Sequence, residues 1–148
     1  MRLSTRGKYG VKAMAELALH YGEGPTSLKL IAERQGLSEH YLEQLIAPLR
    51  KAGLVRSLRG AQGGYLLGRQ PATITVGEIV RVLEGPIAPS ECASEVRQRY
   101  HHCGTARGCV TRKVWTKLRD SIASALDSVT LADLCKEAKD VPKGMYYI

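Results

Sequence analysis

The apolar residues near the start of the chain recur every three or four positions, which predicts two amphipathic helices. The first helix begins after Ser4 or Thr5, and its apolar stripe consists of Val11, Met14, Leu17, Ala18 and Tyr21. A shorter second helix begins after Ser27, whose hydroxyl can accept a hydrogen bond from an unpaired amide of the first turn. Its inner face carries Leu28, Ile31 and Ala32. Gly36 predicts a tight turn after this helix, because glycine adopts positive φ without steric cost.

A third helix is predicted from Ser38, and its apolar stripe consists of Leu42, Leu45, Ile46 and Leu49. Pro48 lies within this stripe and lacks the N–H that would bond to the preceding turn. We therefore expect a straight segment from Ser38 to Ala47 and a bent tail through Ala52.

Two short β-prone runs follow, Leu54–Leu58 and Tyr65–Leu67, and they flank the glycine-rich segment 59–64. This pattern predicts a β-hairpin. Three helices followed by a glycine-tipped hairpin are typical of the winged helix-turn-helix, in which the third helix enters the major groove of DNA. We therefore predict a mainly α-helical protein with a small β-hairpin wing, and a DNA-binding domain at residues 1–86.

The second half of the chain contains a fourth helix, a segment without periodicity and a long helix. Thr75 and Glu78 form a capping-box pattern before a helix with Val76, Ile79, Val80 and Leu83, which Gly85 and Pro86 end. The periodicity disappears from Ile87 to Gly108. A long amphipathic helix then carries Val114, Trp115, Leu118, Ile122, Ala125, Leu126 and Val129. Thr130 and Asp133 predict the start of a last short helix.

Composition and charge agree with a globular protein that binds a polyanion. The chain has 148 residues, enough for one modest core, of which 44% are hydrophobic and 24% charged. Its 22 Lys and Arg against 14 Asp and Glu give a net charge of +8, which suits nucleic acid, although ribosomal and membrane-surface proteins share such a surplus. The N-terminus is polar and basic, and no apolar run reaches the roughly 18 residues of a membrane span. We therefore expect a cytoplasmic protein without a membrane segment.

The third helix supplies residue types that read DNA. Its outward positions are Glu39, His40, Glu43, Gln44 and Ala47, with Ser38 and Tyr41 at the entry end. Glutamine can pair with adenine, glutamate can accept from the cytosine amine, and serine or tyrosine suits phosphates and base edges. Because a carboxylate repels phosphate, we expect Glu43 to discriminate between sequences rather than to add affinity.

The predicted wing adds positive charge beside this helix. The segment from Arg50 to Arg69 contains five basic residues and no acid. Arg59, next to Gly60 at the tip of the hairpin, fits insertion into a narrow minor groove. A helix-turn-helix can also serve as a protein-interaction module, and a basic hairpin can be a solvated edge. Shape and charge together favour double-stranded DNA, with Arg50, Arg59 and Gly60 among the contacts.

Three of the four cysteines lie in the segment without periodicity. Ten residues separate Cys92 from Cys103, and five separate Cys103 from Cys109. Cytoplasmic thiols stay reduced, so clustered cysteines there bind metal or carry out redox chemistry more often than they form disulfides. Three thiolates can ligate zinc or an iron–sulfur cluster, and the spacing favours neither; three unrelated thiols are a further alternative. Cys135 is expected to be a small core residue of the last helix.

Several segments resemble the IscR-type family of small transcription regulators, which includes NsrR, RirA and CymR. The matching segments are Arg2–Gly10, Leu37–Leu45, Gly53–Val55, Arg59–Gly68 and Gly77–Ile79, and the resemblance extends over nearly the full length. It implies a homodimer that binds a roughly palindromic operator, with a dimerisation helix and tail at residues 110–148. It also implies a sensor loop at residues 87–109, whose Cys92, Cys103 and Cys109 hold an iron–sulfur cluster, which we expect to be 2Fe–2S. The regulated genes would be those of iron–sulfur cluster assembly.

Two departures from the family pattern leave the fourth ligand of such a cluster unknown. The IscR pattern has a histidine three residues after the last loop cysteine, where this chain has Arg112, and a guanidinium cannot ligate iron. Some relatives supply a carboxylate near the N-terminus of the partner subunit, where this chain has Lys8. The local candidates are His101, His102, Glu91 and Glu95.

Other stretches resemble CymR in particular, namely Ser27–Lys29, Ser38–Tyr41 and Arg81–Ile87. That relative lacks the cluster and works through a partner enzyme. The alternative function is therefore a cluster-free thiol switch, or a partner-controlled repressor of cysteine metabolism. A thiol redox enzyme is not expected, because the chain has neither a Cys-x-x-Cys motif nor a βαβ pattern.

Overall fold

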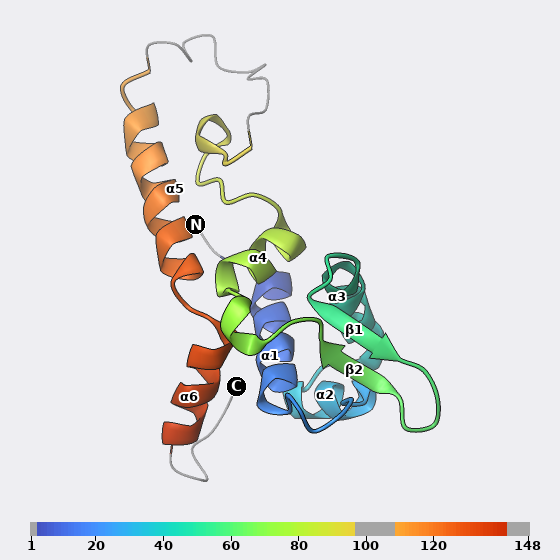
Figure 1. Ribbon diagram of the computed structural model, residues 1–148. Coiled ribbons are helices and arrows are strands. Elements are labelled where there is room, and N and C mark those ends of the chain that lie inside the picture. The colour runs from blue at the N-terminus through green and yellow to red at the C-terminus, as the bar shows by residue number, and fades with distance from the viewer. Residues whose placement is uncertain (1–2, 97–108, 142–148) are drawn as a thin grey trace.

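The computed structural model describes residues 3–96 and 109–141, and Figure 1 shows a mainly helical arrangement with a small two-stranded hairpin at one side. The first three helices are α1 (Thr5–Leu19), α2 (Leu28–Gln35) and α3 (Glu39–Lys51). Each begins directly after a serine, as predicted, and the three serine hydroxyls each accept a 3.2 Å hydrogen bond from an amide of the first turn. Pro48 does not end α3, which continues to Lys51.

The predicted wing consists of β1 (Val55–Leu58) and β2 (Gly64–Leu67), which pair antiparallel. Thr26, between α1 and α2, exchanges two backbone hydrogen bonds of 2.8 and 2.9 Å with Tyr65 and so fixes the wing to the helices. This close approach requires glycine at position 64, because a Cβ there would lie 2.4 Å from the carbonyl oxygen of Thr26. The register pairs Val55 with Leu67 and Leu58 with Gly64.

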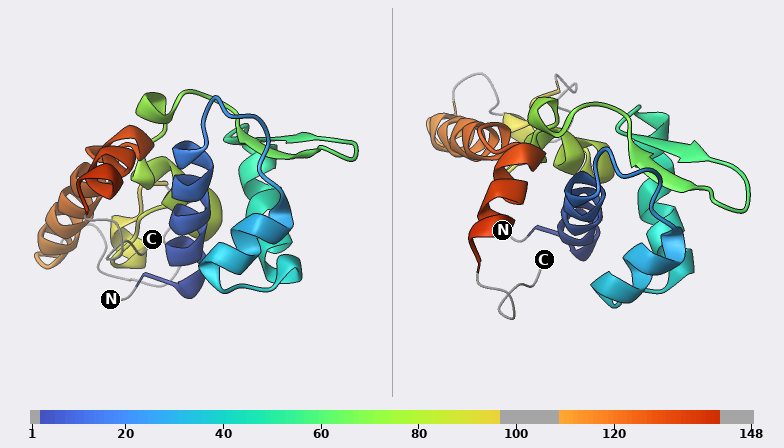
Figure 2. Two further views of the ribbon diagram at one scale, coloured as in Figure 1. Left: turned by 90° about the horizontal axis from the view of Figure 1, so that it is seen from below. Right: turned by 60° about the horizontal axis from the view of Figure 1, so that its bottom comes forward.

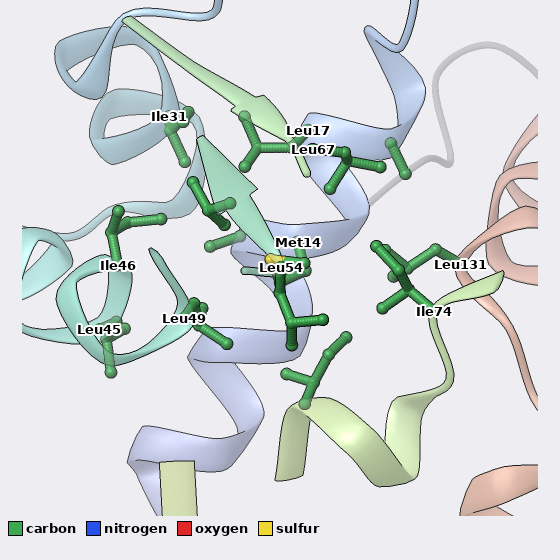
Figure 3. Packing of buried hydrophobic residues seen from close by; sticks show 14 of the residues in the cluster. Met14, Leu17, Ile31, Leu45, Ile46, Leu49, Leu54, Leu67, Ile74 and Leu131 are labelled. Atoms are coloured by element: carbon green, nitrogen blue, oxygen red, sulfur yellow. The ribbon is translucent and has the colours of Figure 1, made fainter. Parts of the chain in front are cut away.

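Side chains from the first to the last described helix share one hydrophobic core (Figure 3). α4 (Val76–Glu84) follows a 3-10 turn, Pro71–Thr73, and packs against α1 and α3. α6 (Leu131–Asp140) returns to α1, and its Leu131 lies beside Ile74, both without exposed surface. The C-terminal helix therefore completes the core of the N-terminal domain. Other fully buried members are Met14, Ile31, Leu42, Leu45, Ile46, Leu49, Leu54 and Ile79.

The starts of α4 and α6 are joined by their backbones. Thr75 and Thr130, the two N-cap residues, form an isolated antiparallel bridge. Thr130 and Asp133 make a complete capping box, in which the Asp133 carboxylate accepts from the Thr130 amide at 2.9 Å. At Thr75 only half of the predicted box exists, because the Glu78 carboxylate instead accepts a 2.5 Å hydrogen bond from Arg69.

The long helix α5 (Arg112–Asp127) lies outside this core and contributes no buried residue. Both views of Figure 2 place α5 and the wing at opposite sides of the molecule. Val114, Trp115 and Leu118 leave an apolar strip of α5 exposed, with 38 to 58% of each residue's surface accessible. Within residues 3–96 and 109–141, no helix is both long and apolar enough to span a bilayer.

The position of Leu131 predicts that shortening this one side chain of α6 destabilises the core that it shares with α1–α4. Leu131→Ala should lower the free energy of unfolding by about 2–5 kcal/mol, because a fully buried leucine is replaced by a cavity. Urea unfolding at fixed protein concentration would measure the change. Lys136→Ala, on the exposed face of the same helix, is the control and should change stability by less than about 0.5 kcal/mol. Equal stability of the two variants would contradict the shared core.

Candidate nucleic-acid interface and cysteine site

The polar face of α3 points away from the core, because the apolar stripe on its other side is buried. All the predicted outward residues of this helix are exposed, together with its N-cap: Ser38, Glu39, His40, Glu43, Gln44 and Ala47. Their exposure leaves one side of the helix open to a large partner. Their individual contacts with DNA stay a prediction.

Tyr41 differs from its predicted place at the entry of this face. It is half-buried, and its ring meets that of Tyr9 on α1 edge to face, with centroids 6.3 Å apart and planes at 89°. The pair fixes the start of α3 against α1, and Lys12 lies 5.5 Å above the Tyr9 ring. Sequence reasoning missed Tyr9, because an aromatic residue in the first helix gives no indication of its partner in the third.

Two of the outward side chains on α3 are bonded to each other. Gln44 Nε2 lies 3.2 Å from His40 Nε2, one helical turn away. The interaction orients the amide that we expect to read adenine. Glu43 lies on the same face and forms no ion pair with any described residue, so its carboxylate remains available.

The end of α3 and the wing present exposed cations. Arg59 and Gly60 lie in the exposed turn of the wing, which a 3.0 Å hydrogen bond from the Gly63 amide to the Gly60 carbonyl closes. Of the five basic residues predicted here, Arg69 is neutralised by Glu78. The other four are exposed and make no ion pair within the described part of the chain: Arg50, Lys51, Arg56 and Arg59.

Cys92 and Cys109 are connected through the first turn of α5. Cys92 lies in the 3-10 turn Glu91–Ala93, and Cys109 comes just before α5; both are half-buried. The Arg112 guanidinium, three residues after Cys109, donates from Nε to the Cys92 carbonyl at 3.1 Å. Arg119, two turns further along α5, donates to the Ala93 carbonyl at 3.3 Å. The long helix thereby holds the turn that carries Cys92.

The surroundings of Cys109 stabilise its thiolate. Its Sγ lies 3.0 Å from the Thr111 hydroxyl, and this hydrogen bond, with the amides of Arg112 and Thr111, holds the pKa of Cys109 below its ordinary value. A thiolate is the form that ligates metal or reacts with oxidants. Burial instead raises the pKa of Cys135, which packs against the core as predicted.

Two of the three loop cysteines that would ligate a soft metal or cluster lie in the described part of the chain. Cys92 and Cys109 are connected through α5, and thiolates are the ligands that iron–sulfur clusters and zinc prefer. Among residues 3–96 and 109–141, no three Cys, His, Asp or Glu side chains come together. The third loop cysteine, Cys103, and the candidates His101 and His102 lie outside these ranges.

Glu95, another candidate for the fourth ligand, is held by other groups. Its carboxylate accepts hydrogen bonds from Arg81 at 2.7 to 3.2 Å and from the Ile87 amide at 2.9 Å. Hydrogen bonding by Arg81 holds the pKa of Glu95 below its ordinary value. Glu91 is exposed, and so is Lys8 on α1. Glu95 thus fixes the segment 87–95, which carries Cys92. Glu91 remains as a candidate ligand in this segment.

Comparisons with known proteins agree with this architecture. Residues 3–137 match the family model Rrf2, described as an iron-dependent transcriptional regulator. The chain is 49% identical to the HTH-type transcriptional regulator CymR of Bacillus subtilis strain 168, over the full length of both chains. It is 42% identical to the HTH-type transcriptional regulator IscR of Yersinia pseudotuberculosis, over 90% of this chain and 79% of IscR.

Solved structures of both kinds of relative have the same fold. CymR, the global cysteine regulator of B. subtilis, superposes with a TM-score of 0.76 at 50% identity, over 93% of this chain and 98% of CymR. IscR of T. potens gives a TM-score of 0.76 at 53% identity, over 97% of this chain and 94% of IscR. These structures support the winged-helix fold, and the relatives are transcription regulators rather than enzymes.

The thiolate environment of Cys109 generates a test in metal-free protein. Thr111→Val removes the hydroxyl that bonds to Cys109, so the pKa of Cys109 should rise and its thiolate population at pH 7 should fall. Alkylation of Cys109 by iodoacetamide should slow by about two- to fivefold, because the thiolate is the reacting form. Peptide-resolved mass spectrometry would follow each thiol, with Cys135 as the internal control. An unchanged Cys109 rate would contradict the assigned hydrogen bond.

Proposed function

The chain belongs to the Rrf2 family of transcriptional regulators, and from this premise we propose that it is a homodimeric repressor or dual regulator that binds operator DNA through α3 and the wing. The observation that carries this proposal is the exposed polar face of α3 next to four exposed cations that form no ion pair with another described residue. Such a surface supplies base-reading groups and phosphate-neutralising charge side by side. A regulator of this kind works in the cytoplasm.

Each proposed contact follows from the chemistry of the side chain. Gln44 pairs with adenine in the major groove, and Glu43 selects a cytosine amine. Ser38, His40 and the hydroxyl of the half-buried Tyr41 contact phosphates and base edges at the entry end of the helix, and Glu39 accepts from a base amine. Arg59, with Gly60 beside it, enters the minor groove, and Arg50 contacts the phosphate backbone.

The exposed apolar strip of α5 is the proposed dimer contact. Val114, Trp115 and Leu118 are exposed along one helix, and a second copy of α5 would remove them from water. A two-fold dimer places its recognition helices about one DNA turn apart, which fits a palindromic operator.

We further propose that Cys92, Cys103 and Cys109 hold an iron–sulfur cluster of the 2Fe–2S type, whose presence changes operator binding and so controls cluster-assembly genes. When bound, the cluster supplies a redox-active group that is lost and rebuilt with iron and sulfide supply. The chain's own contribution is to hold the Cys92 turn on α5 through Arg112 and to keep Cys109 as a thiolate. The iron-dependent family description supports this role. The fourth ligand is unassigned.

A second candidate function is a cluster-free regulator of cysteine metabolism, working as a thiol switch or through a partner protein. The full-length identity of 49% to CymR favours it, as does Arg112 at the position where a histidine ligand is expected. The lowered pKa of Cys109 also suits direct oxidation.

The proposed contact of Arg59 with DNA predicts that its removal weakens operator binding and leaves dimerisation unchanged. Arg59→Ala should weaken binding to an operator selected from random duplex DNA by about tenfold or more, as loss of a specific arginine contact costs about 1–3 kcal/mol. Fluorescence anisotropy at several salt concentrations would measure the change, with the dimer monitored by sedimentation. Lys136→Ala removes one positive charge on α6 and is the control. A similar effect of both variants would indicate net charge alone, and an unchanged affinity of Arg59→Ala would refute the wing contact.

The cluster predicts visible absorbance that depends on three cysteines. Anaerobically purified protein should contain iron and acid-labile sulfide, and Cys92→Ala, Cys103→Ala and Cys109→Ala should each lose the colour. Cys135→Ala should keep it, because Cys135 packs against the core. A colourless protein with zinc or without metal would reject the cluster and leave DNA binding intact. Reversible loss of operator binding after peroxide treatment of iron-free protein would then support the thiol switch.

A further inference from the structure

Arg81 on α4 joins three parts of the chain that are distant in sequence. Its guanidinium donates three hydrogen bonds of 2.7 to 3.2 Å to the carboxylate of Glu95, three residues after Cys92. It donates two more, of 2.6 and 3.0 Å, to the carboxylate of Asp127 at the end of α5. Only a guanidinium has enough donors in one plane to hold two carboxylates in this way.

The contact with Glu95 is the more sheltered of the two. The side chain of Glu95 is 23% exposed and that of Asp127 43%, while Arg81 itself is 30% exposed. Glu95 also accepts the Ile87 amide at 2.9 Å, which closes the segment 87–95 into a loop. Ile87 and Ala93 are buried, so the segment is seated by apolar contacts as well as by charge.

The helix that carries Arg81 belongs to the DNA-binding domain. α4 buries Ile79, Val80 and Leu83, and it packs against α1 and α3. Arg81 therefore connects the turn that holds Cys92 with a helix that supports the recognition helix. Arg112 and Arg119 hold the same turn from the side of α5.

We propose that Arg81 is a positioning residue that seats the Cys92 segment on the DNA-binding domain and couples the exposure of Cys92 to operator binding. The inference rests on the proposed roles of α3 in DNA binding and of Cys92 in sensing, but it requires no bound cluster. In this proposal Glu95 has a structural role. A change in the position of the segment 87–95 is transmitted directly to α4 through Arg81. Because coupling between two sites is reciprocal, operator DNA must change the reactivity of Cys92.

The first arm of the test measures thiol exposure in metal-free protein without DNA. Glu95→Gln keeps the size of the side chain but removes its charge, and Arg81→Gln removes both ion pairs. Alkylation of Cys92 should accelerate by about fivefold or more in each variant, because a segment that opens more often exposes its thiol more often. Asp127→Asn removes the negative charge only from the contact between Arg81 and α5. It is the matched control and should leave the Cys92 alkylation rate within about twofold of the parent. Cys135, on α6, is the internal control in every protein.

The second arm repeats the measurement with saturating operator DNA. In the parent protein, DNA should change the Cys92 rate by about twofold or more, and Glu95→Gln should abolish that change while still binding the operator. DNA that covered Cys92 directly would protect both proteins equally, so this comparison separates coupling from shielding.

The outcomes separate this inference from the proposed cluster. An unchanged Cys92 rate in Glu95→Gln and Arg81→Gln would overturn the positioning role. Equal acceleration of Cys92 and Cys135, or an equal effect of Asp127→Asn, would show general destabilisation and overturn it as well. A DNA effect that persists in Glu95→Gln would overturn the coupling. Success in both arms with a protein that binds no cluster would establish the positioning and coupling role and reject the cluster alone.

Discussion

The burial of Leu131 beside Ile74 is the constraint on which the rest of the structure depends. Leu131 comes from the last described helix, yet it fills a core whose other members come from the first 83 residues. The backbone bridge between Thr75 and Thr130 keeps it there. The described residues between α4 and α6 therefore lie between two elements that are joined to each other. Among them, Ile87 and Ala93 are buried, whereas α5 contributes no buried residue.

The same core sets the orientation of α3. Because Leu42, Leu45, Ile46 and Leu49 are buried, helical geometry turns the polar positions of α3 outward. The wing is fixed by the pairing of Thr26 with Tyr65, which places exposed arginines beside that face. Tyr9 and Tyr41 hold the start of α3. These contacts join α1, α2, α3 and the wing directly, and they place the polar face of α3 and the exposed arginines of the wing near one another.

Local patterns predicted most of the fold. Serine caps, apolar periodicity and the glycine-rich hairpin have their partners within a few residues, and α1, α2, α3 and the wing were accordingly predictable. Contacts between distant residues were not. Glu78 fits a capping box by spacing but pairs with Arg69, and Glu95 fits a ligand by proximity to Cys92 but pairs with Arg81. In both cases an arginine from elsewhere in the fold competes for the carboxylate, and charge pairing prevails over the local pattern.

Arg112 connects the two proposed sensing chemistries. It cannot ligate iron, but its guanidinium holds the carbonyl of Cys92 and its amide helps to stabilise the thiolate of Cys109. Metal ligation and oxidation both require a thiolate, so this arrangement prepares the site for either reaction. A thiol switch needs one or two such groups, whereas the loop carries three cysteines. Three thiolates can act together on one metal centre, so the number of cysteines fits the proposed cluster, while the lowered pKa of Cys109 fits the proposed switch equally well.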